Sequence, residues 1–71
     1  MKKNLTRVDS SMVYAVGYDE ENKVLEVVFR KGSIWQYRGV PKRVYEELIH
    51  SGSIGSYMRN EVLDCYEARQ V

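Results

Sequence analysis

The sequence predicts a small α+β domain: a three-stranded antiparallel meander followed by two helices packed on one face of the sheet, in the order βββαα. Three observations predict this fold. Three runs rich in β-branched and aromatic residues lie close together in the first half of the chain. The connections between them are shorter than the roughly dozen residues that a parallel crossover needs. The second half carries two segments with the apolar spacing of amphipathic helices.

The predicted strands cover residues 12–18, 24–30 and 33–38. In the second strand, Leu25, Val27 and Phe29 lie at alternate positions, so their side chains share one face. A polar turn joins the first two strands. Lys31-Gly32 forms a tight turn between the second and third strands, because Gly32 is free to adopt a positive φ.

Two amphipathic helices are predicted after the sheet. Pro41 suits the first position of a helix, because the N–H that it lacks has no partner there. The apolar residues of this helix are Val44, Tyr45, Leu48 and Ile49. Gly52 ends it, and Ser53 caps a second helix that runs to about Asp64. Residues 65–71 either continue this helix or leave it.

The bulk composition is that of one globular domain. A chain of 71 residues has room for a single core, and we expect a flexible N-terminus over residues 1–8 and a single domain over residues 9–71. One cysteine excludes an internal disulfide framework. No apolar run approaches the roughly 18 residues of a membrane span, and no apolar segment follows the basic start. We therefore expect a cytoplasmic protein that has no membrane contact.

No catalytic, metal-binding or cofactor motif is found. His50 and Cys65 are the only histidine and cysteine, and they lie in unrelated parts of the chain. We expect His50 on the surface near a helix end and Cys65 as a small apolar residue on a helix. The P-loop, GxGxxG, CxxC and HExxH patterns are all missing from the sequence. We therefore predict that the protein is not an enzyme and takes no cofactor or metal.

Trp35 and Tyr37 lie two residues apart on the third predicted strand, so they point to the same face. Two interpretations stay open. An aromatic pair on a sheet can stack nucleic-acid bases. The alternation of the strand favours a core position, in which both rings join Leu25, Val27 and Phe29 beneath the helices.

A stretch without acidic residues runs from Val27 to Tyr45. Its cations are Arg30, Lys31, Arg38, Lys42 and Arg43. We expect Arg30 and Arg38 to lie nearly opposite each other across the tight turn and to form one basic edge with the other cations. Such an edge would bind phosphates with modest, salt-sensitive affinity. The alternative is an ordinary solvated surface whose cations pair with nearby glutamates.

A series of short segments, in order along the chain, resembles a known family. They are Val8-Asp9-Ser10-Ser11, Gly17-Tyr18-Asp19, Leu25-Glu26-Val27-Val28-Phe29, Gly32-Ser33-Ile34-Trp35-Gln36-Tyr37, Val40-Pro41-Lys42-Arg43-Val44-Tyr45, Ser53-Ile54-Gly55-Ser56-Tyr57 and Tyr66-Glu67-Ala68-Arg69. Together they resemble the KTSC domain, a short module found at the C-terminus of some lysyl-tRNA synthetases and as a stand-alone bacterial or phage protein. The family is marked by a central Tyr-x-Tyr, in which Trp35 here replaces the first tyrosine. The synthetase context implies RNA as a partner.

The sequence therefore predicts a small non-catalytic module that binds RNA or other nucleic acid. The five cations of the acid-free stretch would contact phosphates, and Trp35 or Tyr37 would stack on bases. The alternative is a protein–protein interaction or homodimerisation module with no nucleic-acid role. Its surface would be an exposed sheet edge or the face that carries Val24, Val28 and Ile34.

Overall fold

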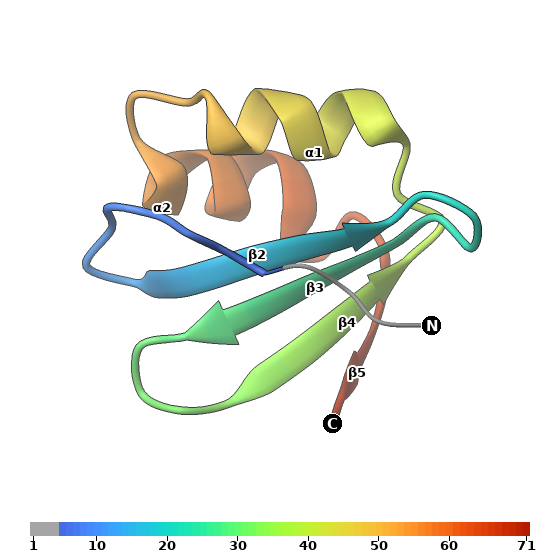
Figure 1. Cartoon of the computed structure of the whole chain (residues 1–71), viewed down its shortest axis with the longest axis horizontal. Helices are drawn as coiled ribbons and strands as arrows, with labels where there is room; N and C mark the ends of the chain where they lie inside the picture. The colour runs from blue at the N-terminus through green and yellow to red at the C-terminus, as the bar shows by residue number, and fades with distance from the viewer. Residues whose placement is uncertain (1–4) are drawn as a thin grey trace.

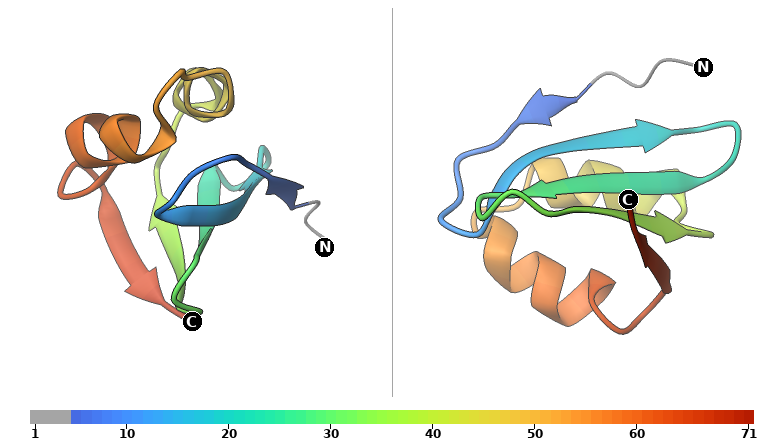
Figure 2. Two further views of the ribbon diagram at one scale, coloured as in Figure 1. Left: turned by 90° about the vertical axis from the view of Figure 1, so that its left-hand side faces the viewer. Right: turned by 90° about the horizontal axis from the view of Figure 1, so that it is seen from below.

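The computed structural model describes residues 5–71 as two layers, with helices on one face of a β-sheet (Figure 1). The strands are β1 (Thr6–Arg7), β2 (Val13–Asp19), β3 (Val24–Phe29), β4 (Ile34–Arg38) and β5 (Glu67–Gln70). The helices are α1 (Lys42–Ile49), α2 (Ile54–Tyr57) and a π-helix, η1 (Met58–Val62). The described strands form one antiparallel sheet in the order β1-β2-β3-β4-β5. Figure 2 shows the helices on one side of this sheet.

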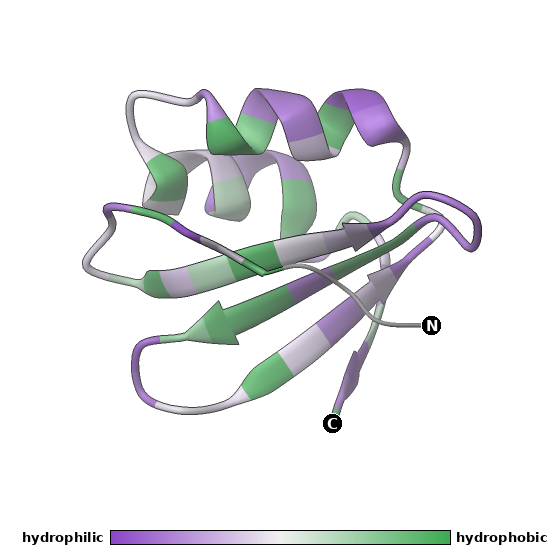
Figure 3. Cartoon of the chain, viewed as in Figure 1, coloured by the Kyte–Doolittle hydropathy of each residue, from purple (hydrophilic) through white to green (hydrophobic). Residues whose placement is uncertain are grey.

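The predicted three-stranded meander followed by two helices is wrong, because the described chain adds a strand at each edge of the sheet. β2, β3 and β4 lie within the predicted runs or extend one of them by a residue. The expected flexible N-terminus falls partly on residues 1–4, which lie outside the described part, while Thr6–Arg7 pairs with β2. β5 is mostly polar and is exposed along its whole length (Figure 3). Its extended conformation comes from pairing with β4, since Glu, Ala and Gln have little intrinsic preference for strands.

The two predicted helices are present with altered ends. Pro41 is the N-cap residue of α1 rather than its first helical residue. The second helix widens into η1, where the Leu63 N–H donates to the Met58 carbonyl at 2.7 Å, five residues back. Asp64, at a φ of 64°, then turns the chain toward β5. Cys65 lies exposed in that turn, so its predicted place as an apolar helix residue is wrong.

The core lies between the sheet and the helices. Its fully buried side chains are Val13, Val16, Leu25, Val27, Val40, Leu48, Met58 and Val62. Tyr37 joins them at 3% exposed, which confirms the predicted core position for that ring. Leu25 and Val27 confirm that the predicted face of β3 is the inner one. In the described part of the chain, no helix is long and apolar enough to cross a membrane.

A β-bulge at Tyr14 divides β2 into two registers. Val13 pairs with Phe29, but Ala15 pairs with Val28, so Tyr14 is the extra residue. Its ring points outward and is flanked by Arg7, with the guanidinium carbon 4.9 Å from the ring centroid. The bulge lets Val13 and Ala15 both be buried on opposite faces of the sheet.

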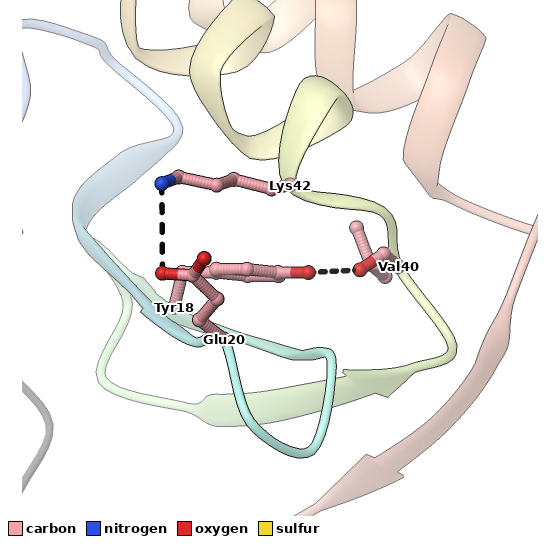
Figure 4. A network of polar contacts seen from close by, with 4 residues as sticks. All are labelled: Tyr18, Glu20, Val40 and Lys42. Atoms are coloured by element: carbon pink, nitrogen blue, oxygen red, sulfur yellow. Dashed lines mark hydrogen bonds and ion pairs between the residues drawn. The ribbon is translucent and has the colours of Figure 1, made fainter.

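The connection between β4 and α1 is held at both backbone groups of Val40, and Figure 4 shows the contact at its carbonyl. The Val40 N–H donates to the carbonyl of Lys23 at 2.9 Å, and the Tyr18 hydroxyl donates to the Val40 carbonyl. Lys42, the first residue of α1, forms an ion pair with Glu20 at 3.5 Å. These contacts join the β2–β3 turn to the start of the helix.

Candidate functional site

An open groove of about 730 Å³ lies where β4 and β5 meet the segment that follows η1. Its lining is mostly apolar. The lining residues are Met12, Phe29, Lys31, Ser33, Trp35, Tyr37, Leu63, Asp64, Ala68 and Gln70. The groove therefore combines aromatic and aliphatic surface with a few charged and polar groups, which is typical of ligand sites.

Trp35 is shared between the core and the groove. It pairs with Val27 on one side and Gln70 on the other, so its side chain points to the helix-side face of the sheet. It packs against the core and is only half-buried. Tyr37 lies deeper, and burial, followed by the charge of Asp64, raises the pKa of its phenol. Of the two rings, Trp35 is the one that a ligand can reach.

Three cationic residues adjoin Met12 or the groove at the β3–β4 turn, although the guanidinium of Arg30 is directed to Ser10 and to the Tyr14 ring, 5.6 Å from its centroid. Lys31 lines the groove itself. The backbone N–H of Arg30 donates to the Met12 carbonyl at 3.0 Å, and its Nε donates to the Ser10 carbonyl at 2.6 Å. Nη1 of Arg59, on η1, lies 3.8 Å from the Met12 sulfur. We call Arg30, Lys31 and Arg59 the Met12 cation cluster.

Arg38 lies far from this cluster, so the predicted single basic edge is wrong. Arg38 pairs with Val24, at the opposite end of β3 from Arg30. Arg30 lies six residue steps along the extended chain from Val24, which is roughly 20 Å. The reason is the tight turn: it closes at Phe29 and Ser33, so β4 runs away from Arg30 before it reaches Arg38.

Lys42 and Arg43 lie at the start of α1, also away from the groove, and both have acidic partners. Lys42 pairs with Glu20 at 3.5 Å, and Arg43 pairs with Glu47 at 3.5 Å. Both pairs are solvent-exposed, and such pairs contribute at most about 1 kcal/mol. Of the predicted site residues, Lys31, Trp35 and Tyr37 line the groove, and Arg30 is joined to the groove residue Met12 through its backbone alone.

Met12 and Arg59 were missed by sequence reasoning. Arg59 lies outside the acid-free stretch and 47 residues from Met12 in the chain. Only the packing of η1 beside the start of β2 brings them together. The position of Arg59 on a predicted helix, one residue after the buried Met58, was the one available signal.

The face that carries Val24, Val28 and Ile34 is the one opposite the helices. Val28 pairs with Ile34 and with Ala15, which makes an apolar row across three strands. Each of the three predicted residues is partly buried within the chain itself. The apolar surface that these residues expose is therefore smaller than the sequence suggested.

The remaining candidate groups lie apart from the groove. His50 follows α1 on the surface, and its Nδ1 lies 2.8 Å from the Glu46 carbonyl oxygen. Among the described residues, no three histidine, cysteine, aspartate or glutamate side chains are grouped so as to hold a metal ion.

Comparison with known proteins places this geometry in a family. The family model of the KTSC domain matches residues 9–66. An uncharacterised protein of Stutzerimonas stutzeri is 36% identical over 50 residues, which are 70% of each chain. A protein of Tsukamurella paurometabola is 31% identical over 61 residues, 86% of this chain and 91% of that protein.

A solved structure extends the similarity to the whole fold. The crystal structure of a KTSC domain protein from Yersinia pestis superposes with a TM-score of 0.96 at 28% sequence identity. The superposition covers 99% of both chains, so it includes the two edge strands that the sequence did not predict. The sequence match and the shared fold agree, and the chain belongs to the KTSC domain family.

Proposed function

We propose that this KTSC domain is a small non-catalytic module that binds single-stranded RNA or other nucleic acid in the Trp35 groove. The observation that supports the proposal is that the groove is lined by both a reachable tryptophan and Lys31, with Arg59 beside the lining residue Met12. The sequence-based prediction of a basic edge is thereby replaced by a smaller surface at one end of the groove. A cytoplasmic location, where RNA is available, is part of the same proposal.

Trp35 is the residue we assign to base stacking. Its backbone is paired with β3 on one side and β5 on the other, and its indole packs against the core, so the ring is held in place before a ligand arrives. A pre-positioned ring loses little conformational entropy when a base stacks on it. Base–aromatic stacking contributes about 1–3 kcal/mol and depends little on sequence. Binding with weak sequence preference is therefore expected.

Lys31 and Arg59 are the residues we assign to phosphate contacts. Both are exposed, and neither forms an ion pair with another described residue. Arg30 is partly engaged by its bond to the Ser10 carbonyl, so it serves as a weaker contact. Two or three phosphate contacts on a single strand predict a slope of log affinity against log salt of about −2. The affinity is therefore modest and falls as salt rises.

The test is an anisotropy titration with labelled single-stranded RNA at low and moderate salt. Lys31→Ala and Arg59→Ala should each weaken binding and make the salt slope shallower by about 0.7. Arg38→Ala and Arg43→Ala are matched controls, since they remove the same charge at sites away from the groove. Trp35→Phe keeps a ring, whereas Trp35→Ala removes it and should cost about 1–3 kcal/mol of binding. Circular dichroism checks that each variant is folded.

Two outcomes would contradict the proposal. The first is no binding at low salt, where phosphate affinity is strongest. The second is an equal loss for the groove variants and the control variants, which would indicate attraction to net charge alone. Binding to a protein segment that is insensitive to salt and lost in Trp35→Ala would instead assign the groove to protein recognition, as its apolar lining by Phe29 and Leu63 allows.

A further inference from the structure

The outer edge of β5 pairs with no other strand of residues 5–71. β5 lies last in the sheet order, with β4 on one side and no described strand on the other. All of its residues are exposed. Figure 2 shows β5 at the border of the sheet, away from β2 and β3. An unpaired edge is a template for pairing with another strand.

The hydrogen bonds to β4 determine which residues of β5 are available at this edge. The Val71 N–H donates to the Ile34 carbonyl at 2.9 Å, and these residues are direct cross-strand neighbours in the register of β4 and β5. Hydrogen-bonded pairs alternate along an antiparallel ladder. Glu67 and Arg69 therefore direct their backbone groups toward β4. Ala68 and Gln70 direct theirs outward, where they can bond to a further strand.

The charges of β5 select one register for pairing with a second copy. Antiparallel pairing through the outward groups permits three central registers. One places Glu67 opposite Glu67 of the second copy, and another places Arg69 opposite Arg69. The third places Ala68 opposite Ala68, so that Glu67 faces Arg69 of the second copy twice over. Opposite charges stabilise such cross-strand pairs, and like charges destabilise them.

We infer that the chain forms a homodimer by antiparallel pairing of β5 with β5, with Ala68 at the two-fold axis. The pairing joins two sheets into one continuous sheet. Glu67 and Arg69 share the face opposite the helices, because they alternate with Ala68 and Gln70, which line the groove. In this register each Glu67–Arg69 pair is of the non-hydrogen-bonded kind, in which side chains lie closest.

The intrachain neighbours of β5 extend the same charge pattern. Arg38 is the cross-strand partner of Glu67, and Gln36 is that of Arg69. Gln36 in turn donates to Glu26 at 3.1 Å. In the dimer a row across the joined sheet would read Glu26, Gln36, Arg69, then Glu67 and Arg38 of the second copy. Each Glu67 would lie between Arg38 of its own chain and Arg69 of the other copy. Arg38, which lies away from the groove, would thus help to stabilise the dimer.

The inference does not depend on nucleic-acid binding, because Glu67 and Arg69 do not line the groove. Its test is sedimentation analysis of purified protein up to about 1 mM, since small interfaces are weak. Glu67→Arg leaves only arginines at the two charged positions, and Arg69→Glu leaves only glutamates. Each single variant should dissociate at least about tenfold more readily than the parent.

Mixing the two single variants provides the decisive result. The arginine introduced in one variant then faces the glutamate introduced in the other, and the unchanged Arg69 of the first faces the unchanged Glu67 of the second. A heterodimer should therefore form although neither variant self-associates. The double variant Glu67→Arg with Arg69→Glu should also regain self-association. Like Glu67→Arg alone, the double variant places an arginine beside Arg38 of the same chain. If the double variant self-associates, the loss seen in Glu67→Arg was not caused by detachment of β5 from β4.

The inference is overturned if the parent stays monomeric over the whole concentration range, or if it dimerises but the charge variants and their mixture behave like it. Dimerisation that is lost in Val28→Glu and unaffected by the charge changes would place the interface on the sheet face around Val28 and Ile34 rather than at the edge of β5. The variant Ala68→Pro gives a second measurement. Its missing N–H belongs to the free edge, so the variant keeps the ladder to β4 and should be monomeric.

Discussion

The Tyr57 hydroxyl donates a hydrogen bond to Glu47 at 2.7 Å and so links α2 to α1. Burial, then that hydrogen bond and the charge of Glu47, raise the pKa of Tyr57 to about 12. The phenol of an unfolded tyrosine titrates near pH 10. The neutral phenol is therefore favoured by the fold. Its stabilising contribution is complete below about pH 10 and is lost as the pH rises through about 12.

The prediction from Tyr57 is a loss of stability in alkaline solution. The free energy of unfolding of the parent should fall between about pH 10 and about pH 12 more steeply than that of Tyr57→Phe, which has no proton to lose there. Urea unfolding at a series of pH values measures both. Tyr14→Phe, at an exposed tyrosine, is the control and should follow the parent. Parallel curves for the parent and Tyr57→Phe would show that Tyr57 has no such role.

Among single residues, those whose environment depends on local alternation could be predicted from the sequence. Leu25 and Val27 follow period two on one strand, and they are buried as expected. Trp35 shows the limit of this reasoning. Its face was predictable, but its half-exposed state depends on how far the helices and the segment around Leu63 cover that face. Such coverage is a property of packing between distant segments, which periodicity does not contain.

At the scale of elements, the connections depend on specific backbone conformations. Gly39, between β4 and α1, has a φ of 75°, and apart from its chain neighbours no atom of residues 5–71 lies within 4 Å of where a side-chain carbon would be. Gly39→Ala should therefore cost about 1 kcal/mol of stability through the backbone alone. Gly52→Ala is the matched control, because its site is equally open and its φ is not in the left-handed region. Thermal unfolding compares them, and equal effects would refute the backbone explanation.

The same scale shows why two strands escaped prediction. The runs that became β2, β3 and β4 carry enough β-branched and aromatic residues to indicate strands by themselves. β1 has only two residues, and β5 reads Glu-Ala-Arg-Gln. Both are extended because a neighbouring strand offers hydrogen-bond partners. The widening of the second helix into η1 was equally hidden, since the apolar spacing of that segment is the same for an α-helix and does not indicate a π-helix.

At the scale of the whole molecule, the core is small and each member contributes a large share. A domain of this length has a total stability of roughly 4–10 kcal/mol. Leu48, on α1, is fully buried between the helix layer and the sheet. Leu48→Ala should cost about 2–5 kcal/mol, which is a substantial part of the total. Ile49→Ala is the control on the same helix; Ile49 is only partly buried, so its loss should be smaller. Similar losses for both would mean that α1 is not oriented as described.

The charge distribution also has to be considered over the whole molecule. The acid-free stretch was one segment in the sequence, but a hairpin sends its two halves to opposite ends of the sheet. Arg30 and Lys31 join Arg59 near the groove, while Arg38 lies opposite Glu67 on β5. Sequence composition could predict that cations gather. It could not predict which of them meet, because that depends on hairpin register and on the last strand of the sheet.

The attachment at Val40 bears on how the two layers move. Both backbone groups of this residue are engaged, the N–H by the β2–β3 turn and the carbonyl by Tyr18, just before the chain enters α1. The segment at Val40 is therefore too constrained to act as a hinge between the helices and the sheet. Swinging α1 away from the sheet would require both bonds, and the stacking of Tyr18 on Tyr45, to break together. Helix and sheet are therefore expected to open as one cooperative unit, and the motions that a partner can exploit are confined to the strand edges and the walls of the groove.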